Sequence, residues 1–374
     1  MELVFFFTRG VSLKTWVDKG LFSREKEIFE KYLEQGLFSS ITWVTFGGKD
    51  HEVYKNLLKN SQLDKRISIS APKGFFGSKA GRILFFLFFP ILNKSILRKA
   101  TFFRTNQLDG VLLPLYCKIF FPAKLYLRSG WLHSRNAKGW RRFYFNFIEN
   151  LGYKNACFAS VSNESDFIYL QKKYANTKIM LLGNYINTSR FNILVPSENR
   201  ESTFLFVGNI SNEKNIKLLV ELFSGNEMGC YHIYIYGRGP LLKFIEDFII
   251  SRNLENIHLM GEISNDQLPK VYNRHKFYIQ ISPREGMPKT VLEAMACGCV
   301  CFCSNIDGFS QIIDHNQTGL ILQDLNRKTL LALTKKTQKE LQTISENAAK
   351  KIEDNYSIVN YIQKEKRIYE AADN

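Results

Sequence analysis

Short apolar runs alternate with amphipathic segments along the first half of the chain. Leu3–Phe7 and Ile41–Phe46 have the length and the β-branched or aromatic content of buried strands. Ser23–Gln35 carries apolar positions at helical spacing and predicts an amphipathic helix. Further strands are predicted at Lys124–Leu127 and Ala156–Ser160, and a further helix at Glu164–Tyr174, after which Lys178–Leu182 leads into an irregular stretch. This alternation predicts a parallel sheet covered by helices.

The alternation resumes after an irregular stretch, residues 184–199, in which Pro196, Ser197 and Asn199 suit a linker. The second series predicts strands at Thr203–Val207, Tyr231–Tyr236, Ile257–Met260, Phe277–Ile281 and Val300–Cys303. Helices are predicted at Ile216–Phe223, Leu241–Ser251, Gln267–Asn273, Lys289–Ala296 and near Phe309–Ile313, followed by a polar helix, Lys328–Ile352, and a tail, Ser357–Ala371. The order is doubly wound, and such sheets bind ligands beyond the carboxyl ends of their strands.

Length and composition agree with two domains. The chain has 374 residues, 45% of them hydrophobic and 23% charged, as in folded globular proteins. We predict an N-terminal domain over residues 1–193 and a second over 200–355, with the C-terminal helix, 356–374, packed back on the first.

The positive charge lies in the N-terminal half. Residues 1–195 contain 30 lysines and arginines against 13 acidic residues, whereas residues 196–374 contain 21 against 22. A net charge of +16 makes nucleic acid a candidate partner, but the sequence has no zinc-finger or RNP signature. We therefore expect no nucleic-acid partner. Any partner of the basic surface should contact the N-terminal half.

Seven cysteines, an odd number without a small-domain framework, predict a reducing compartment and thus the cytoplasm. Four of them, Cys297, Cys299, Cys301 and Cys303, alternate along the chain. Zinc sites usually pair ligands as Cys-x2-Cys, and alternate residues of a strand share one face, so packed thiols are the favoured interpretation over a metal site.

The sequence predicts neither a signal peptide nor a membrane-spanning segment. The first residues carry no basic leader, and the longest apolar run, Ile83–Leu92, has ten residues and contains Pro90. We expect a cytoplasmic protein, with peripheral attachment to the inner face of the cell membrane as a further expectation considered below.

The stretch 282–298 has the strongest chemical signal. Pro288 and Gly298 bracket a predicted helix, because proline suits a helix start and glycine a left-handed C-terminal cap. Gly286 lets the preceding loop approach a ligand, and the first amides of the helix suit a diphosphate. Glu285 lies before this anion site and Glu293 about one turn inside the helix. By itself, their spacing is more typical of two solvated glutamates.

Two further loops add suitable groups at strand ends. Residues 206–215 follow a strand and include Asn209 and Lys214, and Lys214 can offset phosphate charge. Tyr236–Pro240 is another strand, glycine turn and helix start, with Arg238 and Gly239.

Together, residues 203–322 resemble the C-terminal domain of the retaining glycosyltransferases of family four, also called glycosyltransferase group 1. The matching segments are Phe206–Gly208, Glu213–Lys214, Tyr236–Pro240, Met260–Gly261, Leu268, Tyr272, Ser282, Glu285–Pro288, Glu293–Gly298 and Thr318–Leu320. The resemblance implies an α/β protein of GT-B architecture, in which two Rossmann-like, doubly wound domains face each other across a cleft.

The resemblance also implies roles for these residues. Glu285 would lie beside the donor sugar as the catalytic residue, and Glu293 would hold the ribose. The diphosphate would lie on Gly286, Met287, Thr290 and Val291, with Lys214 and Arg238–Gly239 in the donor site and Gly261–Ile263 bordering the base. Asn209 stands where the family usually has an arginine, a departure that Arg238 or Lys289 could offset. The sequence contains no Asp-x-Asp motif, and we expect no metal and no cofactor besides the nucleotide sugar.

The N-terminal half matches less closely. Gly10–Trp16, Thr105–Gln107 and Leu127–Trp131 resemble strand-end segments of a bacterial subgroup, so Gly10, Lys14, Asn106 and Arg128 are candidates for the acceptor site or cleft. His133 is a candidate catalytic helper, although a structural or exposed histidine is the simpler interpretation.

The segment Lys73–Arg104 leaves two interpretations open. It combines Phe75, Phe76, Phe85, Phe86, Phe88 and Phe89 with Lys79, Arg82, Lys94, Arg98 and Lys99. An apolar strip flanked by bases is typical of an interfacial anchor on anionic lipid, and a buried core helix explains the phenylalanines equally well. The excess of positive charge in this half favours the anchor.

These expectations combine into one function. The sequence predicts a retaining transfer of a sugar from a UDP- or GDP-sugar to a growing, lipid-linked, cell-surface glycan of the bacterial polysaccharide type. Two alternatives are a GT-B nucleotide-sugar epimerase or hydrolase and, from another class, a basic nucleic-acid-binding protein.

Overall fold

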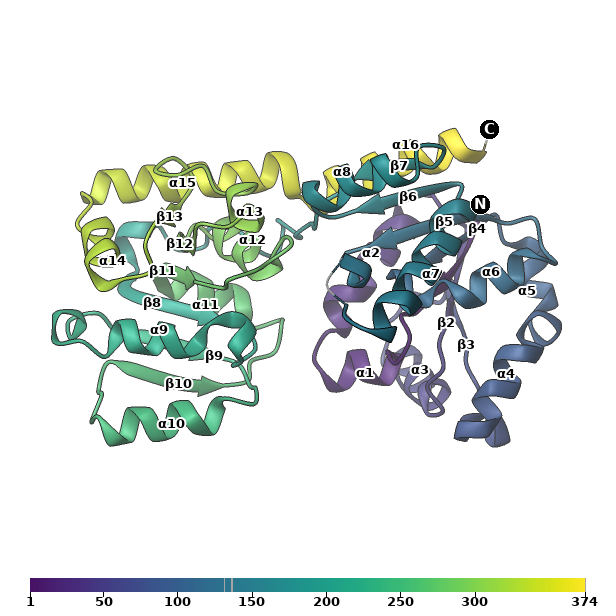
Figure 1. Ribbon diagram of the computed structural model, residues 1–374, viewed down its shortest axis with the longest axis horizontal. Helices are drawn as coiled ribbons and strands as arrows, with labels where there is room; N and C mark the ends of the chain where they lie inside the picture. Colours follow the sequence, from purple (N-terminus) through teal and green to yellow (C-terminus); the bar gives the residue numbers. More distant parts are fainter. Residues whose placement is uncertain (131, 136, 374) are drawn as a thin grey trace. The chain divides into compact units, whose positions relative to one another are not determined.

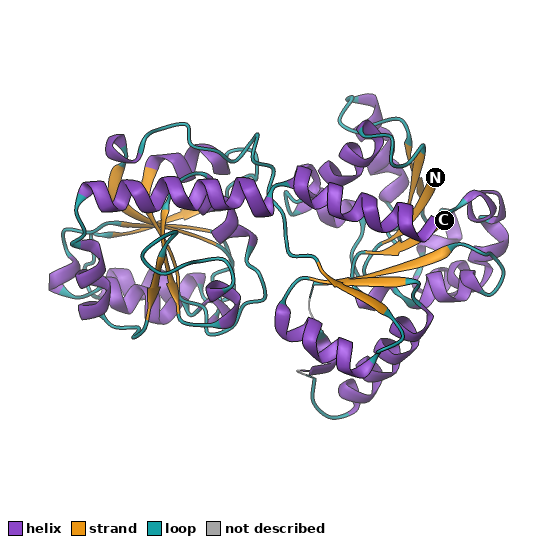
Figure 2. Ribbon diagram, turned by 90° about the horizontal axis from the view of Figure 1, so that it is seen from above, coloured by secondary structure: helices purple, strands orange, loops and turns teal. Residues whose placement is uncertain are grey.

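The chain folds into two units, each a parallel sheet with helices on both faces (Figures 1 and 2). A computed structural model describes residues 1–130, 132–135 and 137–373, apart from the side chain of Lys79. Unit 1 comprises residues 1–183 and 362–374, and unit 2 comprises residues 184–361. The division falls after Gly183, earlier than the predicted boundary between residues 193 and 200. The doubly wound α/β fold is confirmed.

The sheet of unit 1 has seven parallel strands in the order β3-β2-β1-β4-β5-β6-β7. The strands are β1 Glu2–Phe6, β2 Ser40–Val44, β3 Ile67–Ser70, β4 Phe102–Thr105, β5 Lys124–Ser129, β6 Phe158–Val161 and β7 Lys178–Leu181. The strand order reverses between β1 and β4, so the loops that follow these two neighbouring strands diverge to opposite faces of the sheet.

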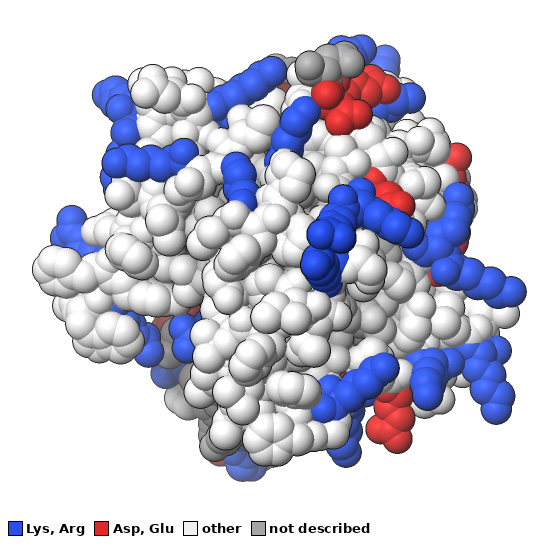
Figure 3. All heavy atoms as spheres, turned by 90° about the vertical axis from the view of Figure 1, so that its right-hand side faces the viewer, with Lys and Arg blue, Asp and Glu red and all other residues white. Residues whose placement is uncertain are grey.

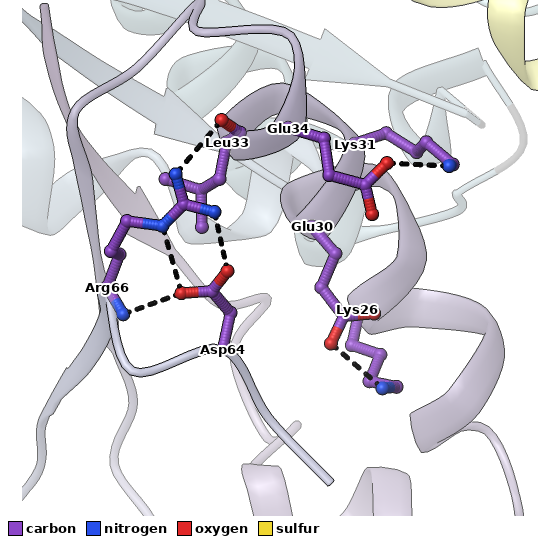
Figure 4. Close-up of polar contacts among 7 residues, drawn as sticks. All are labelled: Lys26, Glu30, Lys31, Leu33, Glu34, Asp64 and Arg66. Carbon is purple, nitrogen blue, oxygen red and sulfur yellow. Dashed lines mark hydrogen bonds and ion pairs between the residues drawn. The ribbon is translucent and has the colours of Figure 1, made fainter. Parts of the chain in front are cut away.

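Eight helices among the described residues cover this sheet before the chain passes to unit 2: α1 Leu13–Asp18, α2 Phe22–Glu34, α3 Asp50–Lys59, α4 Lys79–Leu92, α5 Lys94–Lys99, α6 Leu112–Lys118, α7 Trp140–Asn155 and α8 Glu164–Lys173. Arg66 secures the approach to β3: its guanidinium donates to the Asp64 carboxylate and, at 3.1 Å, to the carbonyl of Leu33 in α2 (Figure 4). The predicted helix at Ser23–Gln35 is thus confirmed as α2.

The last helix, α16 (Ile358–Asp373), joins unit 1 through a buried ion pair. Arg104 of β4 donates through Nη2 to Glu365 Oε1 at 3.0 Å, and both side chains are almost fully buried. The hydroxyl of Tyr126 donates to the same oxygen at 2.6 Å, and Tyr32 contacts both charged groups. Hydrogen bonds from protein groups therefore replace those that water would make to the charged pair.

The sheet of unit 2 has six parallel strands in the order β10-β9-β8-β11-β12-β13. They are β8 Glu201–Val207, β9 Ile233–Tyr236, β10 Ile257–Gly261, β11 His275–Gln280, β12 Val300–Ser304 and β13 Leu320–Leu322. The predicted strands from Thr203 to Cys303 are confirmed as β8 to β12. The order reverses between β8 and β11, which are direct neighbours.

Its helices are α9 Ile216–Phe223, α10 Leu242–Ser251, α11 Leu268–Arg274, α12 Lys289–Ala296, α13 Asp307–Ser310, α14 Arg327–Thr334 and α15 Gln338–Tyr356. The prediction of one polar helix over Lys328–Ile352 was wrong. The chain breaks between α14 and α15, where Thr337 forms a capping box with Glu340 and starts a new helix.

The four alternating cysteines are buried in the core of unit 2 between β12 and α12. Val300 and Phe302 point into the cluster on the other face of β12, as strand alternation requires. Burial raises the pKa of the Cys299 thiol to about 12 and raises the pKa of Cys301 and Cys303 as well. Among the described residues, no three histidine, cysteine or acidic side chains are placed to share a metal ion.

His275 at the start of β11 makes unit 2 sensitive to acid. The ring is fully buried, its Nδ1 lies 2.7 Å from Thr203 Oγ1, and burial lowers its pKa to about 4. Between pH 6.5 and 4 the unfolded chain binds a proton that the folded chain does not, so stability falls as the pH falls through this window. We expect a loss of about 2–3 kcal/mol from this group.

Urea unfolding at pH 7 and pH 4.5, followed by far-ultraviolet circular dichroism, measures this loss. Carboxylates also titrate in this window, so the comparison is with His275→Gln, whose stability should fall less between the two pH values. An equal fall in both proteins would refute the assignment.

Candidate functional site

The loop 281–288 and helix α12 form the centre of the candidate site. Pro288 occupies the N-cap position with φ −74° and ψ 120°, and Gly298 has φ +77°, a left-handed conformation that favours glycine. Both predicted helix ends are confirmed. The amides of Lys289, Thr290 and Val291 belong to the first turn, which carries the positive end of the helix dipole.

Glu285 and Lys214 meet at the point where the strand order of unit 2 reverses. Lys214 ends a short 3-10 helix after β8, and Glu285 lies in the loop after β11. The two residues therefore lie on segments that follow neighbouring strands. The Lys214 ammonium contacts Glu285 Oε1, and the two side chains are 25% and 14% exposed. A cation and a carboxylate are therefore held together beside the N-terminus of α12.

Gln280 connects this pair to helix α12. Its Nε2 donates to Glu285 Oε1 at 2.7 Å, and its Oε1 accepts from the hydroxyls of Tyr278 at 2.9 Å and Thr290 at 3.0 Å. Sequence reasoning missed this residue. The available signal was a single amide within the otherwise apolar or aromatic run 277–281, where an unsatisfied polar group would be costly.

Glu293 is buried within α12, where the hydroxyl of Tyr272 donates to its Oε2 at 3.0 Å. Burial, followed by the negative charge of Glu293, raises the pKa of Tyr272 well above its usual value. The tyrosine therefore stays a hydrogen-bond donor and fixes one carboxylate oxygen. Glu293 is thus a packed and oriented carboxylate, which differs from the solvated glutamate that a bare spacing suggests.

The glycine loops after β8 and β9 pack against each other. A Cβ on Gly237 would lie 1.9 Å from the Gly208 carbonyl oxygen, and one on Gly239 would lie 2.3 Å from that of Ile210. Close packing of the two loops therefore suffices to explain both glycines. Asn209 is exposed on the first loop.

The neighbouring donor-site candidates lie at the ends of β9 and β10. Arg238 pairs with Glu262 at 3.1 Å, and both side chains are more than half exposed, so this pair contributes little to stability. Ile263 packs partly buried against the core of unit 2.

Two contacts that the sequence did not indicate hold the loop at Gly286 and Met287. A Cβ on Gly308 at the start of α13 would lie 2.3 Å from the Glu285 carbonyl oxygen, so only glycine lets α13 approach. Asn184 Nδ2 donates to the Met287 carbonyl at 2.5 Å. The backbone beside the helix terminus is thereby fixed on two sides.

The unit 1 candidates lie at the carboxyl ends of β1, β4 and β5 or just beyond them, with Lys14 in α1. Gly10 is exposed with φ +78°, and the Asn106 amide donates to the Phe6 carbonyl at 3.2 Å. The Lys14 ammonium pairs with Asp18 at 2.6 Å, while its amide donates to the buried Asp50. The structure therefore places Lys14 in a helix pair, and Asp50, which was not predicted, fixes the start of α1.

Two other candidates of unit 1 lie near the end of β5. The amide of Arg128 donates to Thr105 Oγ1 at 3.2 Å. The ring of His133 stacks on Phe145 with centroids 5.0 Å apart, which favours the structural interpretation of this histidine. Trp131, part of the predicted segment 127–131, lies outside the described residues.

Comparisons with known proteins agree with this geometry. A family model described as glycosyl transferases group 1 matches residues 191–352. An uncharacterized glycosyltransferase of Methanocaldococcus jannaschii is 26% identical over 176 residues, which cover 42% of this chain and 49% of the relative.

Two further proteins extend the comparison. A UDP-Gal:alpha-D-GlcNAc-diphosphoundecaprenol alpha-1,3-galactosyltransferase of Escherichia coli is 25% identical over 228 residues, covering 55% of this chain and 58% of the relative. The chain thus spans about half the length of these two relatives. Anabaena HepE, solved with UDP and glucose, superposes with a TM-score of 0.75 at 12% identity over 99% of this chain and 100% of HepE, a likeness of fold.

Over residues 191–352 the chain is therefore similar to the glycosyl transferases group 1 family, and it has an α/β fold of the GT-B type.

Proposed function

We propose that the protein transfers a sugar from a UDP- or GDP-sugar to a growing, lipid-linked, cell-surface glycan, with retention of the anomeric configuration. The observation that carries the proposal is the Glu285–Lys214 pair at the N-terminus of α12. The proposed acceptor follows from the E. coli relative, whose name specifies a diphosphoundecaprenol-linked substrate. Retention follows from the resemblance of the Glu285–Glu293 segment to the retaining family.

The proposed chemistry is electrostatic. As the bond between the sugar and the diphosphate breaks, negative charge grows on the diphosphate and positive charge on the sugar. The first amides of α12 and the ammonium of Lys214 stabilise the diphosphate, and the Glu285 carboxylate stabilises or orients the sugar. On donor binding, Lys214 exchanges its contact with Glu285 for the diphosphate, which leaves the carboxylate to the sugar. Glu293 takes the ribose hydroxyls.

A thermal-shift panel of UDP-, GDP- and ADP-sugars tests the proposal, because a ligand that binds only the folded state raises the melting temperature. Radiolabelled donor then shows whether the sugar moves to an added lipid-linked acceptor. Epimerised or hydrolysed donor without transfer would support the epimerase or hydrolase instead. No shift with any nucleotide sugar would refute the donor site.

Lys214→Met is expected to weaken donor binding by about tenfold to a hundredfold, because it removes one charge-assisted contact to the diphosphate. Isothermal titration calorimetry with the donor identified by the panel measures this effect. Lys217→Met is the matched control, since Lys217 is exposed one turn away and lies over the Phe244 ring. Equal affinities in Lys214→Met and the parent protein would remove Lys214 from the site.

We further propose that the protein attaches peripherally to an anionic membrane through α4. The structure divides the phenylalanines of this segment: Phe85 and Phe89 are buried in the core, whereas Phe88 is 48% exposed. Ile83, Leu87 and Ile91, spaced one turn apart, are also exposed, and this exposed row supports the proposed anchor. Within the described residues, no helix is long and apolar enough to span a bilayer.

Positive charge surrounds this apolar strip. Between Asp64 and Glu149 the sequence has sixteen lysines and arginines and a single acidic residue, Asp109. Figure 3 shows a face of the molecule on which lysine and arginine side chains far outnumber acidic ones. The side chain of Lys79 lies outside the described residues. Exposed apolar side chains within basic surface fit the interface of an anionic bilayer.

Ile91→Glu is expected to reduce sedimentation with phosphatidylglycerol vesicles by at least about fivefold, because it places a carboxylate in the apolar strip. Phosphatidylcholine vesicles should retain little of either protein. Ile250→Glu is the control, since Ile250 is equally exposed on α10 of unit 2. Unchanged sedimentation of Ile91→Glu would rule out α4 as the anchor.

A further inference from the structure

Gln280, the last residue of β11, carries a buried amide beside Glu285. The residue is 1% exposed. Ile279 points into the core on the opposite face of the sheet, so Gln280 and Tyr278 share the face that packs on α12. An apolar side chain would fill such a position, and burying an amide is costly unless it is hydrogen-bonded. A glutamine here therefore has a reason besides packing.

The Gln280 amide uses all of its hydrogen-bonding capacity. Nε2 donates to Glu285 Oε1 at 2.7 Å and to Ser282 Oγ at 3.3 Å. Oε1 accepts from the hydroxyls of Tyr278 and Thr290. An amide has two hydrogens to donate and an oxygen with two lone pairs, so these four bonds offset the cost of its burial.

The partners of this amide also fix its orientation. A carboxylate only accepts hydrogen bonds, so the Gln280 atom next to Glu285 must be the nitrogen. Burial raises the pKa of Tyr278 well above its usual value, so the phenol stays protonated and donates to the oxygen. The two ends of the amide therefore cannot exchange, and its nitrogen points to Glu285.

We propose that Gln280 is a positioning residue for sugar transfer, an inference that rests on the proposed function for the role of Glu285. Gln280 holds Oε1 of Glu285 so that the other carboxylate oxygen faces the donor sugar after Lys214 has moved to the diphosphate. Unlike Lys214, the amide is neutral and is held on its far side by two hydroxyls, so a bound diphosphate does not draw it away.

Thr290 gives this arrangement a second connection to the donor. Its hydroxyl donates to Gln280, while its backbone amide lies in the first turn of α12, where we propose that the diphosphate binds. One buried amide thus connects the two places at which charge develops during transfer. A misplacement of about 1 Å at a reacting group can lower the rate by about a hundredfold.

Gln280→Met tests the inference, because it removes all four hydrogen bonds and nearly keeps the length of the side chain. We expect kcat for transfer to fall by about tenfold to a hundredfold, with the Kd of the donor within about threefold of the parent value, since Gln280 acts through Glu285. Gln280→Glu keeps an oxygen for Tyr278 and Thr290 but turns a second oxygen toward Glu285, so it should lower kcat at least as much.

A double-mutant cycle separates positioning from a purely structural role. In the Glu285→Gln background, followed by single-turnover transfer over long incubations, Gln280→Met should cost less than about threefold in kcat. The carboxylate that Gln280 positions is already absent there. If Gln280→Met unfolds, Tyr278→Phe is the milder variant: it frees one side of the Gln280 oxygen, and kcat should fall by about threefold to tenfold with the same dependence on Glu285.

Gln171→Met is the matched control, because Gln171 is exposed on α8 of unit 1, and it should transfer at the parent rate. Circular dichroism verifies that each variant is folded. Parent kcat in folded Gln280→Met, or an equal loss with and without the Glu285 carboxylate, would overturn the inference and leave the transferase proposal standing. No transfer by the parent protein would refute the proposed function and this inference with it, so the two failures give different results.

Discussion

Replacing Glu285 by glutamine is expected to lower kcat for sugar transfer by at least about a thousandfold, the upper range for removal of one electrostatic contact to a transition state. Glutamine keeps the size of the side chain and an oxygen that can accept from Gln280 Nε2, so the loop should hold its shape. It removes the negative charge that we propose faces the donor sugar. It also releases Lys214 from a competing carboxylate, so donor affinity should stay within about threefold of the parent value or increase.

Single-turnover transfer and calorimetric donor binding, measured on the same preparation, separate these two effects. Glu221→Gln is the control because Glu221 is an exposed carboxylate of α9 outside the site. Glu293→Gln should instead weaken nucleotide binding, since we propose that Glu293 binds the ribose. Full transfer activity in Glu285→Gln would refute the role given to this residue.

The sequence predicted features of the site that depend on local chemistry. Pro288 and Gly298 mark both ends of α12 because each acts through its own backbone torsion, which needs no distant partner. The strands β8, β9, β11 and β12 were predictable for the same reason, since a largely buried strand reads as a short apolar run. The break before α15 also has a local cause, because Thr337 and Glu340 form a capping box. The polar composition of the segment obscured this signal.

The remaining features depend on which strands become neighbours. Lys214 and Glu285 are 71 residues apart and meet only because β11 lies beside β8 in the sheet. Gly308 is required by the carbonyl of Glu285, a contact that no local pattern encodes. A pocket in unit 1 that Arg9 and Asp109 both line likewise arises because β4 pairs with β1.

Replacing Glu365 by alanine is expected to lower the free energy of unfolding of unit 1 by about 3–5 kcal/mol, because it leaves the Arg104 guanidinium buried without its carboxylate. Arg104 is 3% exposed and Glu365 is fully buried, so water cannot substitute for the lost partner. The hydroxyl of Tyr126 loses an acceptor in the same change. This single substitution therefore removes contacts between α16 and three other elements, α2, β4 and β5.

Tryptophan fluorescence during urea unfolding reports this loss selectively, since all four tryptophans of the chain, Trp16, Trp43, Trp131 and Trp140, lie in the sequence of unit 1. Glu370→Ala is the matched control: its partner on the same helix is Lys366 at 3.8 Å, the pair is half exposed, and the expected change is below about 1 kcal/mol. The double replacement Arg104→Met with Glu365→Leu should recover most of the stability, because it removes the stranded charge and fills the volume with hydrocarbon. A double variant as unstable as Glu365→Ala would show that the hydrogen bonds to the tyrosines, more than the buried charge, hold α16 on the sheet.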